Sequence, residues 1–276
     1  MTAAAFRDLA PEEVAVHGGV VSCTIAGAGP AMIFLHGWTL DSRMWAPQVA
    51  AFARGFRVIA PDRRGFGRSS APPDLAREPD DIARLLDHVG AARAVVVGMS
   101  QAGRVALDFA ARFPDRVDAL ILQGAPFVGP GPHPQDSEAI PIAAWAALAR
   151  EGRLDAMKAQ WRAHPLMRTA NDAAAQTAEA MLRDYRGRDL VAADPIARDD
   201  LDIARIAAPA LALTGARDTA WRRAAADALA AGMPHARRTE IPDAGHLCNL
   251  CAPGVYNAVV ATFLREACAS SGPEPL

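Results

Sequence analysis

The sequence predicts an α/β protein built on a mostly parallel, twisted sheet that is flanked by helices. Short apolar runs alternate with longer segments of helical periodicity along the 276 residues, which is the order expected of strands joined by covering helices. Five of the expected strands are apolar throughout, as strands are when both faces of a parallel sheet are covered. The length is usual for one large α/β domain.

The elements follow one another in a regular series. The strand expected at 19–27 forms an antiparallel hairpin with the residues just before it. Further strands are expected at 31–37, 57–62, 94–99, 117–125, 210–216 and 237–243. Helices are expected at 42–54, 80–90 and 101–112, and near 220–231 and 253–268.

The long segment between the strands at 117–125 and 210–216 has a different pattern. Residues 126–204 contain no strand-like run, and the proline-rich "APFVGPGPHP" at its start cannot sustain a helix. Three amphipathic helical patterns follow, with Trp145, Trp161 and Met181 on their apolar faces. We therefore expect an α/β core formed by 1–125 and 205–270, and a helical lid (cap) at 126–204, inserted after the sixth core strand.

Charge and composition argue against several classes of partner. The chain has 29 basic and 31 acidic residues, so no charge excess favours nucleic acid or an anionic membrane. The N-terminus lacks the apolar region of a signal peptide, and no apolar run approaches the roughly 20 residues that span a bilayer. Four cysteines, at 23, 248, 251 and 268, do not make a disulfide framework. We expect a cytoplasmic protein with neither a nucleic-acid nor a membrane partner.

The stretch "VVVGMSQAGRVALDFA" at 95–110 contains the first candidate for chemistry. An apolar strand stops at Gly98, Ser100 follows, and a helical pattern begins at once. So tight a turn holds its corner residue in a strained conformation at the positive end of the following helix. The neighbours two positions away, Gly98 and Ala102, are small enough for strand and helix to approach closely. Ser100 is therefore predicted to be a nucleophile, and the alternative is an ordinary serine N-cap.

A serine nucleophile needs a base that takes its proton. Two histidines, His246 and His36, lie in loops after expected strands and so at the carboxyl edge of the sheet. The other five lie in helices, in the proline-rich segment or in surface turns, at 17, 88, 133, 164 and 235. We predict that His246 is the base.

The base in turn needs an acid that orients it. Asp218 follows the strand at 210–216, again at the carboxyl edge. Asp243, three residues before His246, is the alternative, although its closeness in sequence favours a role in shaping the turn. We predict Asp218 as the third catalytic residue.

The chain order Ser100, Asp218, His246 resembles that of the α/β-hydrolases, and the resemblance covers roughly residues 19–268. "GMSQA" at 98–102 is similar to the nucleophile elbow G-x-S-x-G, with Ala102 where glycine is usual. "HGW" at 36–38 resembles the oxyanion loop, and "PDRRGFGRSS" at 61–70 resembles the turn after the next strand. The resemblance implies that the backbone N–H groups of Trp38 and Gln101 stabilise an oxyanion.

The function implied by this resemblance is a serine hydrolase that cleaves a small-molecule carboxylic ester or lactone through an acyl-enzyme, with no cofactor and no metal. The family's dehalogenases and epoxide hydrolases use an aspartate at the position of Ser100. Two alternatives stay open. One is a cofactor-free perhydrolase, in which hydrogen peroxide captures the same acyl-enzyme, and the other is a ligand receptor on the same fold that does not turn over.

The substrate pocket is predicted to include Trp38, Trp145, Trp161 and Leu247, although packing between lid and core explains the tryptophans equally well. Arg104 stands in the first turn of the nucleophile helix, where small residues usually pack. It either meets a substrate carboxylate or pairs with an acidic group of the protein. "CNLC" at 248–251 has the spacing of a metal or redox motif, but no second pair completes a zinc site.

Overall fold

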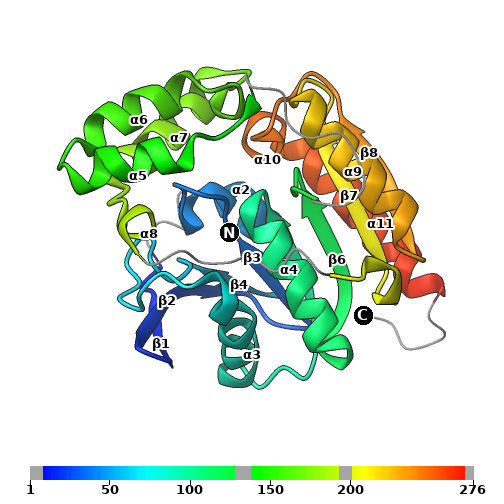
Figure 1. The fold of residues 1–276 in the computed structure, drawn as a ribbon. Helices are drawn as coiled ribbons and strands as arrows, with labels where there is room; N and C mark the ends of the chain where they lie inside the picture. Colours follow the sequence, from blue (N-terminus) through cyan, green and yellow to red (C-terminus); the bar gives the residue numbers. More distant parts are fainter. Residues whose placement is uncertain (1–8, 128–137, 193–200, 271–276) are drawn as a thin grey trace.

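The computed structural model describes residues 9–127, 138–192 and 201–270. Within these ranges eight strands form one sheet, in the order β1-β2-β4-β3-β5-β6-β7-β8 (Figure 1). Strands β1 (Glu12–Val16) and β2 (Gly19–Ala26) form the expected antiparallel hairpin, and β2 pairs antiparallel with β4 (Arg57–Pro61). All other neighbours are parallel, which confirms the predicted mostly parallel sheet.

The remaining strands coincide with those expected from the sequence, and their ends lie within two residues of the expected ends. They are β3 (Ala31–Leu35), β5 (Ala94–Met99), β6 (Val117–Gln123), β7 (Ala210–Gly215) and β8 (Ala236–Ile241). Every residue of β3 and β5 is buried. These two central strands are apolar throughout because helices cover both of their faces.

Helices pack on both faces of the sheet (Figure 1). Side chains alternate along a strand, so Phe34 of β3 points to one face and Ile33 to the other. The first face is covered by α2 (Ala46–Phe52) and α11 (Pro253–Ser270). The second is covered by α3 (Glu78–His88), α4 (Gln101–Arg112) and α9 (Ala220–Gly232). The helix expected at 42–54 begins with a 3₁₀ turn, η1 (Ser42–Trp45).

The described part of residues 126–204 is helical, with α5 (Ile142–Arg150), α6 (Leu154–Ala163), α7 (Asp172–Asp184) and α8 (Arg188–Val191). Figure 1 shows α5, α6 and α7 grouped together at one side of the sheet. Their apolar faces bury Trp145, Trp161 and Leu182 in one cluster with Trp38 of the core. The three amphipathic patterns thus correspond to α5, α6 and α7. His133 and the proline-rich stretch at 128–134 lie outside the described residues.

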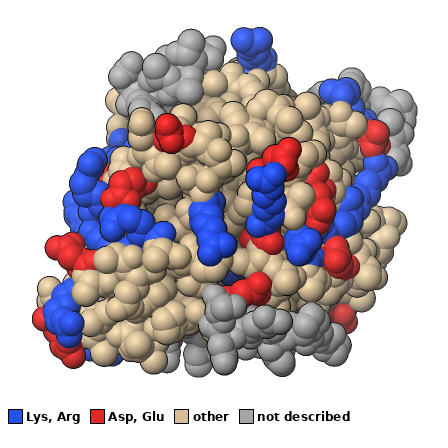
Figure 2. Space-filling model, turned by 90° about the horizontal axis from the view of Figure 1, so that it is seen from above, with Lys and Arg blue, Asp and Glu red and all other residues tan. Residues whose placement is uncertain are grey.

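Charges of both signs are interspersed over the face shown in Figure 2. Exposed ion pairs of this protein, such as Arg162 with Glu179 on the inserted helices, contribute little stability because water screens them. Among the described residues, no helix combines the length and apolar character needed to cross a membrane.

Candidate active site

Ser100 occupies the corner between β5 and α4. Its backbone φ of 55° and ψ of −124° lie where a residue with a Cβ is strained. The Ser100 N–H donates a hydrogen bond of 2.8 Å to the Gln123 carbonyl at the end of β6, which fixes the corner to the neighbouring strand. The sharp turn expected from the sequence is therefore present, and Ser100 is at its apex.

The small residues around Ser100 are required by close packing. A Cβ on Gly98 would lie 2.5 Å from the Ala102 carbonyl oxygen, and one on Gly103 would lie 2.4 Å from the Cβ of Ala125. The close approaches therefore fall at positions 98 and 103. The methyl group of Ala102 is fully buried and fits where the family usually has glycine.

His246 and Asp218 are hydrogen-bonded and almost fully buried. Asp218 follows β7, and its Oδ2 lies 2.9 Å from Nδ1 of His246, while its Oδ1 accepts the Thr219 N–H at 2.8 Å. The other imidazole nitrogen of His246, Nε2, is buried and has no hydrogen-bond partner among the described residues. An imidazole held by a carboxylate on one side and free on the other has the arrangement of a general base.

An amide network holds the backbone of the His246 loop. The buried side chain of Gln123 donates to the His246 carbonyl at 3.1 Å and to Asn249 Oδ1 at 3.0 Å. Gln48 donates to the Asn249 carbonyl from the opposite side, also at 3.1 Å. Strand β6, helix α2 and the loop after β8 are thereby joined behind the imidazole.

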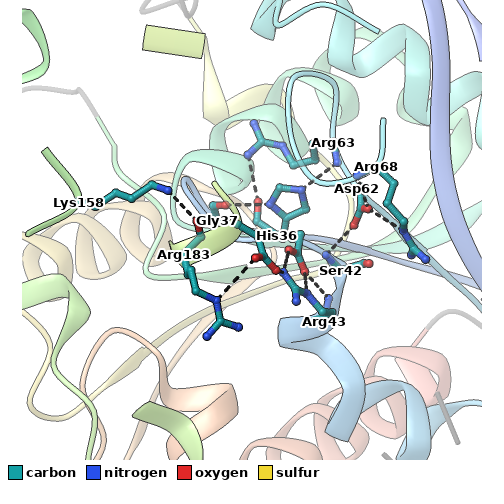
Figure 3. Close-up of polar contacts among 11 residues, drawn as sticks. His36, Gly37, Ser42, Arg43, Asp62, Arg63, Arg68, Lys158 and Arg183 are labelled. Carbon is teal, nitrogen blue, oxygen red and sulfur yellow. Dashed lines mark hydrogen bonds and ion pairs between the residues drawn. The ribbon is translucent and has the colours of Figure 1, made fainter. Parts of the chain in front are cut away.

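The rival residues have other roles. The side chain of Asp243 is 81% exposed and pairs with Arg217 at 2.5 Å, so it belongs to the surface of the turn. His36 is fully buried, donates from Nδ1 to the Gly37 carbonyl and accepts the Arg63 N–H at Nε2, both at 2.8 Å (Figure 3). Burial, reinforced by the charge of Arg63, lowers the pKa of His36 to about 3. His36 is therefore a neutral residue that joins two loops.

The arginines of the "PDRRGFGRSS" turn are bound within the scaffold. Arg63 pairs with Glu78 at 2.7 Å and Arg64 with Asp81 at 2.6 Å, both buried. The Arg63 guanidinium also donates to Gln101 Oε1 at 3.1 and 3.2 Å. The turn thus anchors the first residue of α4, next to Ser100.

Two backbone N–H groups lie close to the Ser100 corner. Gln101 opens α4, where N–H groups have no intrahelical acceptor, and Trp38 follows Gly37, whose Cβ position would lie 2.3 Å from the sulfur of Met99. The loop at 36–38 is therefore packed closely against the end of β5. Neither the Trp38 N–H nor the Gln101 N–H donates to an acceptor in the described ranges.

A cavity of about 310 Å³ adjoins these groups, and Ser100 and His246 both line it. Of the predicted pocket residues, Trp38, Trp161 and Leu247 are on its walls. Trp145 is not among the described lining residues, and its ring stacks on that of Trp38 with the centroids 5.8 Å apart. This corrects the prediction for Trp145. The helical periodicity placed it on the buried face of α5 but could not show that its ring packs on Trp38 and Trp161.

Four charged residues also line the cavity, namely Arg104, Asp108, Glu138 and Arg222. Sequence reasoning singled out Arg104 and missed the other three. Glu138 follows the proline-rich segment, and Arg222 stands in a helix whose pattern gave no sign of a buried charge.

The cysteines of "CNLC" are free thiols in the short helix α10 (Cys248–Cys251). Burial raises the pKa of the Cys248 thiol well above its usual value, which makes it unreactive. The described residues contain no cluster of three or more histidine, cysteine or acidic side chains that could hold a metal ion.

Comparison with known proteins agrees with this geometry. A family model described as the alpha/beta hydrolase fold matches residues 30–151. The putative carbamate hydrolase RutD of Caulobacter sp. is 30% identical over 263 residues, which cover 90% of this chain and 94% of that protein. The chain belongs to the α/β-hydrolase family.

Two further relatives of this α/β-hydrolase differ in how much of the chain they match. An epoxide hydrolase of Caballeronia sordidicola is 39% identical over 125 residues, which are 43% of this chain and only 38% of that relative's length. The structure of a thermophilic esterase from Thermogutta terrifontis superposes with a TM-score of 0.76 at 25% identity, covering 94% of this chain and 99% of the esterase. The family predicted from the sequence is therefore confirmed.

Proposed function

We propose that this α/β-hydrolase is a serine hydrolase that cleaves a carboxylic ester or a lactone through an acyl-enzyme intermediate. The observation that carries the proposal is the hydrogen bond between Asp218 and His246, which leaves the buried Nε2 of His246 without a partner among the described residues, in the cavity that Ser100 also lines. An unactivated serine is a weak nucleophile, and this arrangement supplies the base that it needs.

In the acylation half-reaction, Ser100 Oγ attacks the carbonyl carbon while His246 Nε2 accepts the hydroxyl proton. Asp218 holds the proton on His246 Nδ1, so that Nε2 is the basic nitrogen. The Trp38 and Gln101 N–H groups donate to the oxyanion that develops, and one such donor contributes about 10²–10³ to the rate. His246 then transfers its proton to the leaving alkoxide.

In deacylation, His246 takes a proton from water, whose oxygen attacks the acyl carbon. The bond to Ser100 breaks and the serine regains its proton. An open ester yields an acid and an alcohol, whereas a lactone yields a single hydroxy acid, since acid and alcohol belong to one molecule.

Ester chemistry is favoured over epoxide opening by the residue at the elbow. The epoxide hydrolases that this family contains use an aspartate there, and this chain has Ser100. A carbamate is the second candidate, because the putative carbamate hydrolase aligns over 90% of this chain. Carbamates present the same kind of carbonyl carbon to the serine.

We also propose that 126–204 acts as the lid of this site. Trp161, Leu166 and Met167 come from this segment and line the cavity with Ser100. The indole N–H of Trp161 donates to Thr39 Oγ1 of the core at 2.7 Å, and that of Trp38 donates to Asp189 Oδ2 at 2.5 Å. These bonds support a segment that is held closed over the carboxyl edge of the sheet.

The test is a time course with p-nitrophenyl acetate and butyrate on the wild type, Ser100→Ala and Ser70→Ala. Ser70 is exposed and serves as the matched control. Sustained turnover that vanishes only in Ser100→Ala is expected. Turnover that persists in Ser100→Ala would overturn the assignment of the nucleophile, and a single burst without turnover would indicate a receptor. A lactone and carbamate panel, with a peracid assay in acetate plus peroxide, then identifies the acyl group and its acceptor.

A further inference from the structure

Arg222 is a buried guanidinium in the wall of the catalytic cavity. It stands in the first turn of α9, is only 3% exposed, and lines the cavity that Ser100 and His246 line. Its Nε and Nη1 atoms are buried and have no hydrogen-bond partner among the described residues. Because burying a charged group without hydrogen bonds is costly, two unused donors beside a nucleophile point to a ligand that uses them.

The protein's own carboxylates near Arg222 are engaged with other donors. Asp218 is bonded to His246 and to the Thr219 N–H. Glu138 accepts the Ala220 and Trp221 N–H groups at 2.9 and 3.1 Å, which caps the start of α9. Both acids act on Arg222 only through their charge. They therefore offset part of the free-energy cost of burying the guanidinium, but they do not occupy its hydrogen-bond donors.

Arg222 remains a cation in this setting. Burial is the main cause that lowers its pKa, to about 10, and the charge of Arg104 acts in the same direction. At neutral pH the guanidinium is therefore protonated. Its carbon lies 4.6 Å from the centroid of the Trp221 ring, a cation–π contact that holds the group in place.

The remaining walls restrict what such a ligand can be. The apolar residues Val105, Leu166 and Met167 line the same cavity, and such a wall favours a substrate with a hydrocarbon part between the ester and the group that binds Arg222. Either Nε or Nη1 of this arginine, together with Nη2, forms a fork that binds a carboxylate with two parallel hydrogen bonds. The charges of Asp218 and Glu138 close by disfavour a dianionic phosphate, because like charges repel.

We propose that the substrate carries a second, free carboxylate that binds Arg222, so that the enzyme acts on half-esters of dicarboxylic acids or on lactones that bear a carboxylate. This inference rests on the proposed serine hydrolase. Arg222 binds the far end of the substrate, and Ser100 attacks the ester carbonyl at the near end.

The test compares two esters of equal chain length, mono-p-nitrophenyl glutarate and p-nitrophenyl pentanoate, after subtraction of the spontaneous rates. The wild type should have the higher kcat/KM for the glutarate. Arg222→Met should lower the ratio of the two kcat/KM values by about 10–100-fold, the size of a hydrogen-bonded charge pair. Arg223→Met is the matched control, since this exposed neighbour loses the same charge, and its ratio should equal that of the wild type.

Two results would overturn the carboxylate site while leaving the serine hydrolase intact. One is a wild type that prefers the pentanoate, and the other is an Arg222→Met variant that lowers both kcat/KM values equally, as a purely structural role would. Arg222→Lys keeps the charge without the planar fork, so its ratio of the two kcat/KM values should lie between those of the wild type and Arg222→Met. It also serves as the test variant if Arg222→Met does not fold.

A wild type that hydrolyses neither ester would refute the proposed function instead. Binding at the carboxylate site is then measured by calorimetric titration of monomethyl glutarate into the wild type and Arg222→Met. Binding that requires Arg222 supports the site, and the absence of binding to the wild type overturns it.

Discussion

Gly124 gives a sharp test of how the catalytic histidine is positioned. It follows β6 with a φ of +54°, and a Cβ at this position would lie 2.6 Å from His246 Cε1, 2.7 Å from His246 Nδ1 and 3.2 Å from Asp218 Oδ2. Ordinary contact begins near 3.4 Å, so the Gly124→Ala methyl group must displace the ring by about 0.8 Å. The 2.9 Å bond from His246 to Asp218 lies in the path of that methyl group.

The expected loss follows from this displacement. A misplacement on the order of 1 Å in a catalytic group costs about 10²-fold in rate, so Gly124→Ala should lower kcat/KM for p-nitrophenyl butyrate by about 100-fold. The left-handed backbone adds a cost of about 1–2 kcal/mol for any residue with a Cβ, which corresponds to a fall of roughly 2–8 °C in Tm.

Gly90→Ala separates the two effects. Gly90 has a φ of +67°, and a Cβ built on it meets no atom within 4 Å. This variant should lose a similar amount of stability and keep the wild-type kcat/KM. A Gly124→Ala enzyme that is as active as Gly90→Ala would refute the idea that the glycine holds open the space for the imidazole.

Three further changes test the roles of Asp218, Arg222 and His36. Asp218→Asn should lower kcat for p-nitrophenyl butyrate by about 10⁴-fold with an unchanged circular dichroism spectrum, because the amide favours the wrong tautomer of His246; activity within tenfold of the wild type would contradict this role. Arg222→Met should leave Tm unchanged or higher in thermal unfolding, because it removes a buried charge whose Nε and Nη1 have no hydrogen-bond partner in the described ranges, and a large fall in Tm would show that the guanidinium stabilises the fold. The pKa of His36 is about 3 in the folded state, below the value near 6.5 in the unfolded chain. As the pH falls below about 6.5, the unfolded state therefore binds the proton first, and the free energy of unfolding decreases. Urea unfolding should show a loss of about 2 kcal/mol from this group between pH 6.5 and 5, and His36→Asn should lack that part of the pH dependence, whereas an identical dependence in the variant would contradict it.

The fold was predictable because its signals are local. Each apolar run became a strand within two residues of the expected ends, since a strand covered on both faces needs no long-range information to be apolar. Ser100, Asp218 and His246 could be chosen for the same reason, because each directly follows a strand and parallel strands bring their carboxyl ends to one edge.

The residues that sequence reasoning missed depend on contacts between distant segments. Gln123 holds the His246 loop across 123 positions of sequence, and no motif marks it. In the sequence, Arg222 cannot be told from an exposed helical arginine, because only the packing of α9 places it at the cavity. For Trp145, periodicity identified the buried face of α5 but could not decide between the cavity and the ring of Trp38.

Covalent trapping of the nucleophile tests directly whether Ser100 forms the acyl-enzyme. The enzyme is treated with diethyl p-nitrophenyl phosphate, and the product is analysed by intact mass and by peptide mapping. We expect one diethylphosphoryl group per chain, located on Ser100, and no stable label in Ser100→Ala. A label on another residue, or labelling of Ser100→Ala at the wild-type rate, would contradict the assignment of Ser100 as the residue that forms the acyl-enzyme.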